Sequence, residues 1–226
     1  QKETLIKNTF FLFAIISLLI LFLIVLFLFR EGLPIFKEVT LRDFLFGNEW
    51  YPTYQPPSYG IWPLIVGSLI VTFFSSLIAV PIGVMSAVYI SEVAPEALKE
   101  ILKSIIELLA GLPSVVLGFF GMVVLAPWLQ ETFDLPTGLN IVNASLILAL
   151  MAVPTISSIS EDALYAVPKE FKEASYALGA TKYETIIRVI IPSAFSGMTT
   201  SVILGMARAI GETMVVLMVA GGAAAI

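Results

Sequence analysis

Long apolar stretches alternate with short polar segments along this chain, and the alternation predicts a protein that crosses a membrane several times. Residues 10–29 are apolar except for Ser17, and about 20 helical residues at about 1.5 Å each span a bilayer core. We expect further spans at residues 61–90, 105–129, 141–160 and 192–220. The expected fold class is therefore an all-α polytopic membrane protein with five spans, and we expect a sixth span beyond Ile226.

A cleaved signal peptide is the alternative for the first apolar stretch. The apolar part of a signal peptide is shorter, about 7–15 residues, and small residues at a cleavage site follow it. Here Arg30, Glu31 and Gly32 follow instead, which favours a span that is retained.

The polar segments between the predicted spans differ in composition. Residues 31–60 are rich in Pro and in aromatic rings, which favour the headgroup layer of a membrane. Residues 91–104 are charged and helical in pattern, and residues 161–191 form a charged helical hairpin, called the hairpin below. We expect one transmembrane domain over residues 1–226, with an outer loop at 31–60 and the hairpin in the cytoplasm.

The orientation follows from the distribution of Lys and Arg between the two sides. Eight lie on the side of the amino terminus and the hairpin: Lys2, Lys7, Lys99, Lys103, Lys169, Lys172, Lys182 and Arg188. Three lie on the other side: Arg30, Lys37 and Arg42. Because cytoplasmic loops carry an excess of positive residues, the amino terminus is expected in the cytoplasm.

Composition narrows the possible functions. The chain is 58% hydrophobic and 13% charged, against about 25% charged residues in a soluble domain. It has no Cys and no His, which excludes disulfides, Cys nucleophiles and His bases, and we expect no metal or cofactor. A net charge of −5 without a basic run argues against nucleic acid. No G-x-x-x-x-G-K-[ST] loop is present, so the chain itself is not expected to hydrolyse ATP.

Local signals in the hairpin predict two short helices joined by a glycine turn. Pro168 suits a first helical position, where its missing N–H costs nothing, and Gly179 suits the left-handed conformation that closes a helix. Thr181 and Glu184 form a capping box that begins a second helix, expected to end near Pro192.

Small residues recur at helical spacing in two predicted spans, where they allow another helix to approach closely. In the third span they are Ser114, Gly118 and Gly121. In the fifth span they are Gly197, Ser201, Gly205 and Ala209.

Arg208 and Glu212 lie one turn apart in the fifth predicted span, and both are expected to face protein or water. Each would cost about 2.5–3.5 kcal/mol near the bilayer centre. Two structural interpretations are open: the pair locks helix packing, or Arg208 reaches an interface. In the functional interpretation, Arg208 binds an anionic substrate through its planar guanidinium group, and Glu212 holds or releases that substrate. The hydroxyls that could also line the path, although each is usually bonded to its own helix, are Thr72, Ser75, Ser76, Ser114 and Thr155.

The hairpin resembles the EAA loop of bacterial ABC importer permeases. The matching residues are Glu173-Ala174-Ser175, then Gly179, then Ile191-Pro192, with Ser175 in place of the second Ala and a slightly longer spacing before Ile191. In that family the loop couples the permease to an ATPase subunit by docking into a groove on it. The resemblance assigns this role to Glu173, Ala174, Ser175, Ala177, Leu178 and Gly179.

Residues 204–216, LGMARAIGETMVV, resemble a segment of the permease subunits of the phosphate-specific (Pst) ABC importer, and the C-type rather than the A-type subunit. Residues 106–121, residues 59–95 and the FLFGNEWYP of the outer loop are similar to the same family, in the same order. The resemblance covers most of the chain from Phe44 to Gly222. It places Arg208 and Glu212 at the positions of the charged pair needed for transport.

The resemblance implies a type I ABC importer permease fold and a transport subunit, not an enzyme. The implied activity is ATP-driven import of inorganic phosphate across the cytoplasmic (inner) membrane of a bacterium or archaeon. The implied partners are a homologous A-type permease, two cytoplasmic ATPase subunits, an extracytoplasmic phosphate-binding protein and membrane lipid. The alternatives are a permease for another oxyanion, such as molybdate or sulfate, and a secondary carrier.

Overall fold

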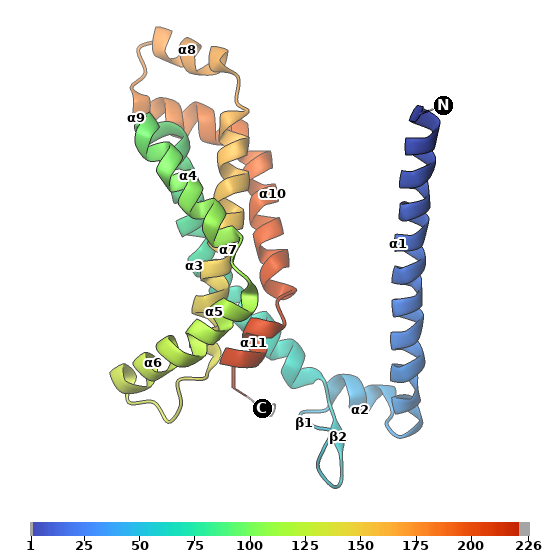
Figure 1. The fold of residues 1–226 in the computed structure, drawn as a ribbon. Coiled ribbons are helices and arrows are strands. Elements are labelled where there is room, and N and C mark those ends of the chain that lie inside the picture. Colours follow the sequence, from blue (N-terminus) through green and yellow to red (C-terminus); the bar gives the residue numbers. More distant parts are fainter. Residues whose placement is uncertain (1, 222–226) are drawn as a thin grey trace. The chain divides into compact units, whose positions relative to one another are not determined.

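The computed structural model describes residues 2–221, which divide into two compact units at Leu64 and Ile65 (Figure 1). Helices long and apolar enough to cross a membrane are found in five segments: Glu3–Lys37, Trp62–Val93, Ser114–Phe133, Ile141–Tyr165 and Lys182–Ile210. The expectation of an all-α polytopic protein with five spans is confirmed.

The first unit contains a long apolar helix followed by a short folded segment. Helix α1 (Lys2–Gly32) covers the predicted first span and continues into a 3₁₀ turn, η1 (Leu33–Lys37). Helix α2 (Leu41–Phe46) begins where the Thr40 side chain accepts a hydrogen bond from the Asp43 N–H. Strands β1 (Trp50–Tyr51) and β2 (Ser58–Tyr59) then pair antiparallel, so residues 31–60 are partly structured.

Helix α3 (Trp62–Val88), which lies mostly in the second unit, continues into a π-helical turn, η2 (Tyr89–Val93). An amphipathic helix, α4 (Glu96–Ala110), comes next. It is followed by α5 (Ser114–Phe120), the π-helical turn η3 (Gly121–Leu125) and α6 (Ala126–Phe133).

The prediction of one continuous span over residues 105–129 is wrong. Residues 105–110 belong to α4, and the chain breaks between Gly111 and Pro113 before the span begins at Ser114. Pro113 has extended backbone angles and cannot donate a helical hydrogen bond, so it separates the two helices. Hydropathy alone does not register this break because both sides of it are apolar.

The second half of this unit begins with α7 (Ile141–Tyr165), a helix that continues through Pro154. After it come α8 (Lys169–Ala177), α9 (Lys182–Thr185), the π-helical turn η4 (Ile186–Ile190), α10 (Ile191–Ile210) and α11 (Met214–Val219). The expected single helix over 192–220 is wrong, because the chain leaves the helix after Ile210 and a separate helix starts at Met214.

The π-helical turns in the described chain each end two residues before a proline, namely Pro95, Pro127 and Pro192. In a regular α-helix a proline ring collides with the carbonyl four residues earlier and removes a hydrogen bond. A π-helical turn relaxes this conflict by inserting one extra residue into the helix. Helix therefore continues from Lys182 to Ile210, and the prediction that the hairpin's second helix ends near Pro192 is wrong.

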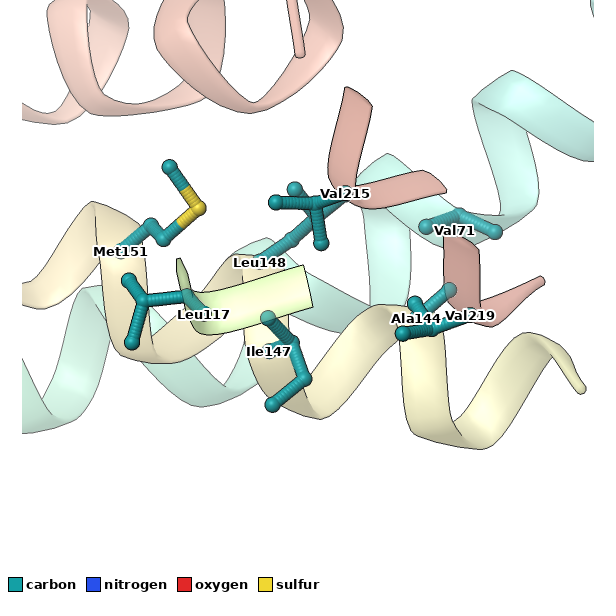
Figure 2. Packing of buried hydrophobic residues seen from close by; sticks show 8 residues of the cluster. All are labelled: Val71, Leu117, Ala144, Ile147, Leu148, Met151, Val215 and Val219. Atoms are coloured by element: carbon teal, nitrogen blue, oxygen red, sulfur yellow. The ribbon is translucent and has the colours of Figure 1, made fainter. Parts of the chain in front are cut away.

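The core is built around α7, which contributes to every apolar cluster found in the described residues. Figure 2 shows the first cluster, in which α3, α5 and α11 meet α7 through Val71, Leu117, Ala144, Ile147, Leu148, Met151, Val215 and Val219. A second cluster lies where the hairpin joins the spans and includes Ala87, Leu164, Ile186 and Ile190. The other apolar surfaces remain exposed in the single chain, as expected for helices that face lipid or further subunits.

The small residues of α10 pack directly against α7 (Figure 1), as their spacing predicts. A Cβ on Gly197 would lie 2.5 Å from the Ala163 Cβ, and one on Gly205 would lie 2.4 Å from the Ile156 Cγ1. Between them, the Ser201 and Ser160 hydroxyls hydrogen bond at 2.6 Å. Gly118 and Gly121 likewise allow α11 and α7 to approach, with Met218 and Val219 as near neighbours.

Candidate functional site

Arg208 lies in the last turn of α10, and its side chain contacts α7. Its Nη1 donates a hydrogen bond of 3.4 Å to the Thr155 hydroxyl, and among the described residues no carboxylate lies within 4.0 Å of the guanidinium. A bond of this length is weak. Arg208 therefore keeps most of its five N–H donors available, and it is exposed in the single chain.

Arg208 lies at the middle of the bundle rather than at its end. Thr155, its partner, is about 21 Å along α7 from Ile141 and about 15 Å from Tyr165, at about 1.5 Å per helical residue. This depth argues against the interpretation in which Arg208 reaches an interface.

Glu212 does not lie on the same helix as Arg208, which corrects the expectation of one continuous helix carrying both. The helix ends at Ile210, Gly211 closes it, and Glu212 belongs to the connection to α11. Its Oε1 lies 3.5 Å from the Val215 N–H, at the start of α11. The two charges are not within ion-pair distance in the described structure, so the interpretation as a mutual packing lock has no contact to support it.

The connection between α10 and α11, residues 211–213, is not helical. In a bilayer core, irregular backbone is tolerated where it is buried in protein or lines a water-filled cavity. Arg208 lies just before this connection, and Glu212 lies within it. The arrangement places a cation, a carboxylate and a non-helical segment within residues 208–213 of the chain.

The hydroxyls named from the sequence divide into different classes. Ser75 donates to the carbonyl of Thr72 in its own helix, as expected for an ordinary helical serine. The Ser76 hydroxyl is buried without a hydrogen-bond partner in the described structure. Thr155 is the one that contacts Arg208, and it is only partly buried.

The hairpin forms largely as its local signals predict. Pro168 precedes the first helix as its N-cap rather than occupying its first turn, and Gly179 has a positive φ of 82°. The capping box between Thr181 and Glu184 is complete in both directions. The start of the predicted segment is different, because Glu161 is still inside α7.

The predicted coupling residues do not all face the same way. Leu178 is 90% exposed at the tip of the hairpin, and Phe171 and Tyr176 are also exposed. Ser175 instead points inward, where its hydroxyl lies 2.9 Å from that of Thr185. The remaining predicted residues are all exposed: Glu173, Ala174, Ala177 and Gly179. Ser175 therefore closes the hairpin, whereas the others form an outward surface.

Ion pairs centred on Glu92 and on Glu161 tie this end of the molecule together, and sequence reasoning missed them. Lys172 of α8 pairs with Glu92 of η2 at 2.7 Å. Glu161 of α7 is 4% exposed and pairs with Lys103 at 2.9 Å and Lys99 at 3.6 Å, both from α4. Their partners are far apart along the chain, so spacing gives no signal for them.

The Glu161 contact affects the titration of Lys103. Its hydrogen bond to Glu161 raises the pKa of Lys103 above the ordinary 10.5, and burial opposes this. The negative charges of Glu161, Asp162 and Glu107 add to the increase in this pKa. Lys103 therefore holds α4 against α7 as a cation.

Comparison with known proteins gives a family match over most of the second unit. Residues 79–225 match the family described as binding-protein-dependent transport system inner membrane component. This range includes the hairpin, Arg208 and Glu212.

Individual relatives agree with this match. A probable ABC transporter permease protein, YqgH, of Bacillus subtilis is 45% identical over 88% of this chain and 65% of its own length. The phosphate transport system permease protein PstC of Pasteurella multocida is 36% identical over 80% of this chain and 62% of its own length. PstC of Haemophilus influenzae is 34% identical over 97% of this chain and 75% of its own length. The chain thus spans slightly less than two thirds of the first two relatives.

The fold is also found in a solved transporter. An inward-facing structure of the MetNI methionine ABC transporter is similar over 67% of this chain and 68% of the solved chain, with a TM-score of 0.53 and 24% identity. At this identity the likeness concerns the fold, which is that of an ABC importer permease.

Proposed function

The chain belongs to the family of binding-protein-dependent transport system inner membrane components, and we propose that it is the C-type permease subunit of an ATP-driven phosphate importer. Membership of this family makes it a multi-pass membrane transport subunit. The relatives named as PstC support phosphate as the substrate.

The observation that carries the proposal is the environment of Arg208. A guanidinium at mid-depth of a membrane bundle, exposed from its own chain and bonded weakly to a hydroxyl, is costly if it faces lipid. The cost is removed if this face of α10 borders a second permease subunit and a water-filled path. The irregular backbone beside Arg208 has the same requirement, because it also needs protein or water as its neighbour.

Phosphate fits the chemistry of this position. Phosphate near neutral pH carries roughly −1.5 to −2 charges, if its second pKa lies near 6 as in phosphoesters. Arg208 would offset part of that charge and donate two parallel hydrogen bonds to the phosphate oxygens. Glu212, next to the same path, would oppose tight binding and keep the site from trapping the ion.

The hairpin would couple this path to ATP hydrolysis. Its exposed surface around Leu178 would dock into a groove on a cytoplasmic ATPase subunit, and a homologous A-type permease would present a second hairpin to a second ATPase. An extracytoplasmic phosphate-binding protein would deliver its cargo to the outer side. The excess of Lys and Arg supports a cytoplasmic amino terminus and a cytoplasmic hairpin.

The test is uptake of radiolabelled phosphate by the assembled transporter in proteoliposomes, supplied with its binding protein. We expect uptake that requires ATP inside and competition by unlabelled phosphate, with little competition from molybdate or sulfate. Equal competition by molybdate or sulfate would assign the chain to another oxyanion. Uptake without ATP, and without an ATPase that co-purifies, would make the protein a secondary carrier.

A further inference from the structure

Helix α8 is attached to the rest of the second unit by polar contacts. Within the described chain, none of its residues belongs to an apolar cluster. Its buried residue is Ser175, which hydrogen bonds to Thr185 in the other half of the hairpin. Its apolar side chains, including Phe171 and Tyr176, are turned outward. The position of α8 relative to the spans therefore depends on its polar side chains rather than on apolar packing.

The contact between α8 and the end of span α3 is the ion pair between Lys172 and Glu92. Lys172 Nζ lies 2.7 Å from Glu92 Oε1, and their side chains are 24% and 9% exposed. Partial burial strengthens the attraction between the charges, and leaving one of them unpaired in such a place is costly. The pair is 80 residues apart in sequence, so it joins two separate structural elements.

Glu92 belongs to the end of a membrane span. It lies in η2, the π-helical turn that extends α3 and is closed by the Ala94 N–H bonding to the Tyr89 carbonyl. One turn earlier, Ala87 is fully buried in the cluster at the root of the hairpin, with Ile186 and Ile190. A displacement of α8 that keeps the ion pair intact therefore acts on the end of α3.

We propose that the Lys172–Glu92 ion pair is a positioning contact that transmits the movement of α8 to span α3 and so sets how much phosphate is moved per ATP. This inference rests on the proposed function, because it takes α8 as the element that docks on the ATPase. Neither residue touches substrate in this assignment. Their role is to make the hairpin and the span move together.

The experiment measures phosphate uptake and ATP hydrolysis together in proteoliposomes that contain the assembled transporter. The variants are Lys172→Glu, Glu92→Lys and the double exchange, with the neutral Glu92→Gln as a milder change. Lys169→Glu is the matched control, because Lys169 is exposed on the same helix and takes part in no ion pair of the described structure. Co-purification of the ATPase reports whether each variant assembles.

We expect each single charge reversal to lower the ratio of phosphate to ATP by about threefold to tenfold, a range typical of coupling residues. The double exchange should restore the ratio, and Lys169→Glu should leave it unchanged. If a single reversal prevents assembly, the double exchange and Glu92→Gln provide the test. The double exchange should then recover assembly and the ratio of phosphate to ATP, and Glu92→Gln should lower that ratio.

Three results would overturn the inference: an unchanged ratio in both single reversals, a double exchange as poor as the single variants, or an equal loss in Lys169→Glu. Each of these would leave ATP-driven phosphate uptake by the unaltered transporter intact. Absence of that uptake in the unaltered transporter would instead refute the proposed function.

Discussion

Arg208 and Thr155 meet across the packed helices α10 and α7, with the guanidinium Nη1 3.4 Å from the hydroxyl oxygen. The contact orients the arginine at mid-depth of the bundle without neutralising its charge. A hydroxyl can direct a guanidinium, whereas a carboxylate at the same place would compete with an incoming anion. Thr155 is therefore expected to act as a positioning residue for Arg208.

Replacing Thr155 with Val removes this hydroxyl at nearly constant shape. We expect phosphate uptake to fall about threefold to tenfold, since a hydrogen bond to a charged group contributes about 1.5–3 kcal/mol and this one is long. Thr199→Val is the control, because the Thr199 hydroxyl donates to the Phe195 carbonyl of its own helix. Uptake by Thr155→Val that equals uptake by Thr199→Val would remove Thr155 from the site.

Gly205→Ala tests the close approach of α10 and α7. The added Cβ would lie 2.4 Å from the Ile156 Cγ1, so one of the two helices has to move. We expect a loss of stability of about 1–3 kcal/mol, seen as a lower thermal unfolding midpoint of the purified transporter. Gly67→Ala in α3 has no neighbouring atom within 4 Å and should not lower the midpoint. Equal midpoints for the two variants would contradict the packing described for α10.

The Lys103–Glu161 contact predicts a loss of stability at alkaline pH. The pKa of Lys103 is higher in the folded protein than the ordinary 10.5, chiefly because of its hydrogen bond to Glu161. Its contribution is therefore complete below pH 10.5 and is lost as the pH rises through the higher folded value. We expect the thermal midpoint to fall less between about pH 9 and about pH 12 in Lys103→Met than in the unaltered protein.

Lys169→Met controls for the general titration of lysines in the same experiment. Lys169 is exposed and forms no ion pair with the residues that the structure describes, so this variant should lose as much stability as the unaltered protein. A Lys103→Met variant with the same alkaline loss would show that the contact with Glu161 does not contribute to stability.

Leu178 tests the docking surface of the hairpin. It is 90% exposed, so Leu178→Asp should change the unfolding free energy of the isolated chain by no more than about 0.5 kcal/mol. We expect the same change to abolish co-purification of the ATPase, because a buried apolar contact at the interface would be replaced by an unpaired charge. Leu178→Met should retain the ATPase. Undiminished co-purification with Leu178→Asp would place the docking surface elsewhere.

The amino-acid sequence predicts those features of this protein that depend on neighbouring residues. The first two spans follow from long, mainly apolar runs, and the turn at Gly179 and the cap at Thr181 follow from local backbone chemistry. The small residues from Gly197 to Ala209 indicate a close helix contact because one repeat of four residues stays on one face.

The features that sequence reasoning missed depend on tertiary context. Apolar residues on both sides of Gly111 hide the helix break there, and π-helical turns allow helix to continue past Pro192. The ion pair of Lys172 with Glu92 joins residues that only the folded chain brings together. The position of Glu212 outside α10 is a consequence of such a break, and it changes how the charged pair is understood.

The most direct test of the central claim is phosphate uptake by the assembled transporter carrying Arg208→Ala. Arg188→Ala is the matched control, since Arg188 lies in η4 of the same continuous helix, near its other end. Arg208→Lys separates charge from geometry, because Lys retains the charge but lacks the planar fork. We expect Arg208→Ala to lose ATP-driven uptake while the ATPase still co-purifies, Arg208→Lys to be impaired, and Arg188→Ala to transport normally. Unchanged uptake in a fully assembled Arg208→Ala transporter would contradict the account.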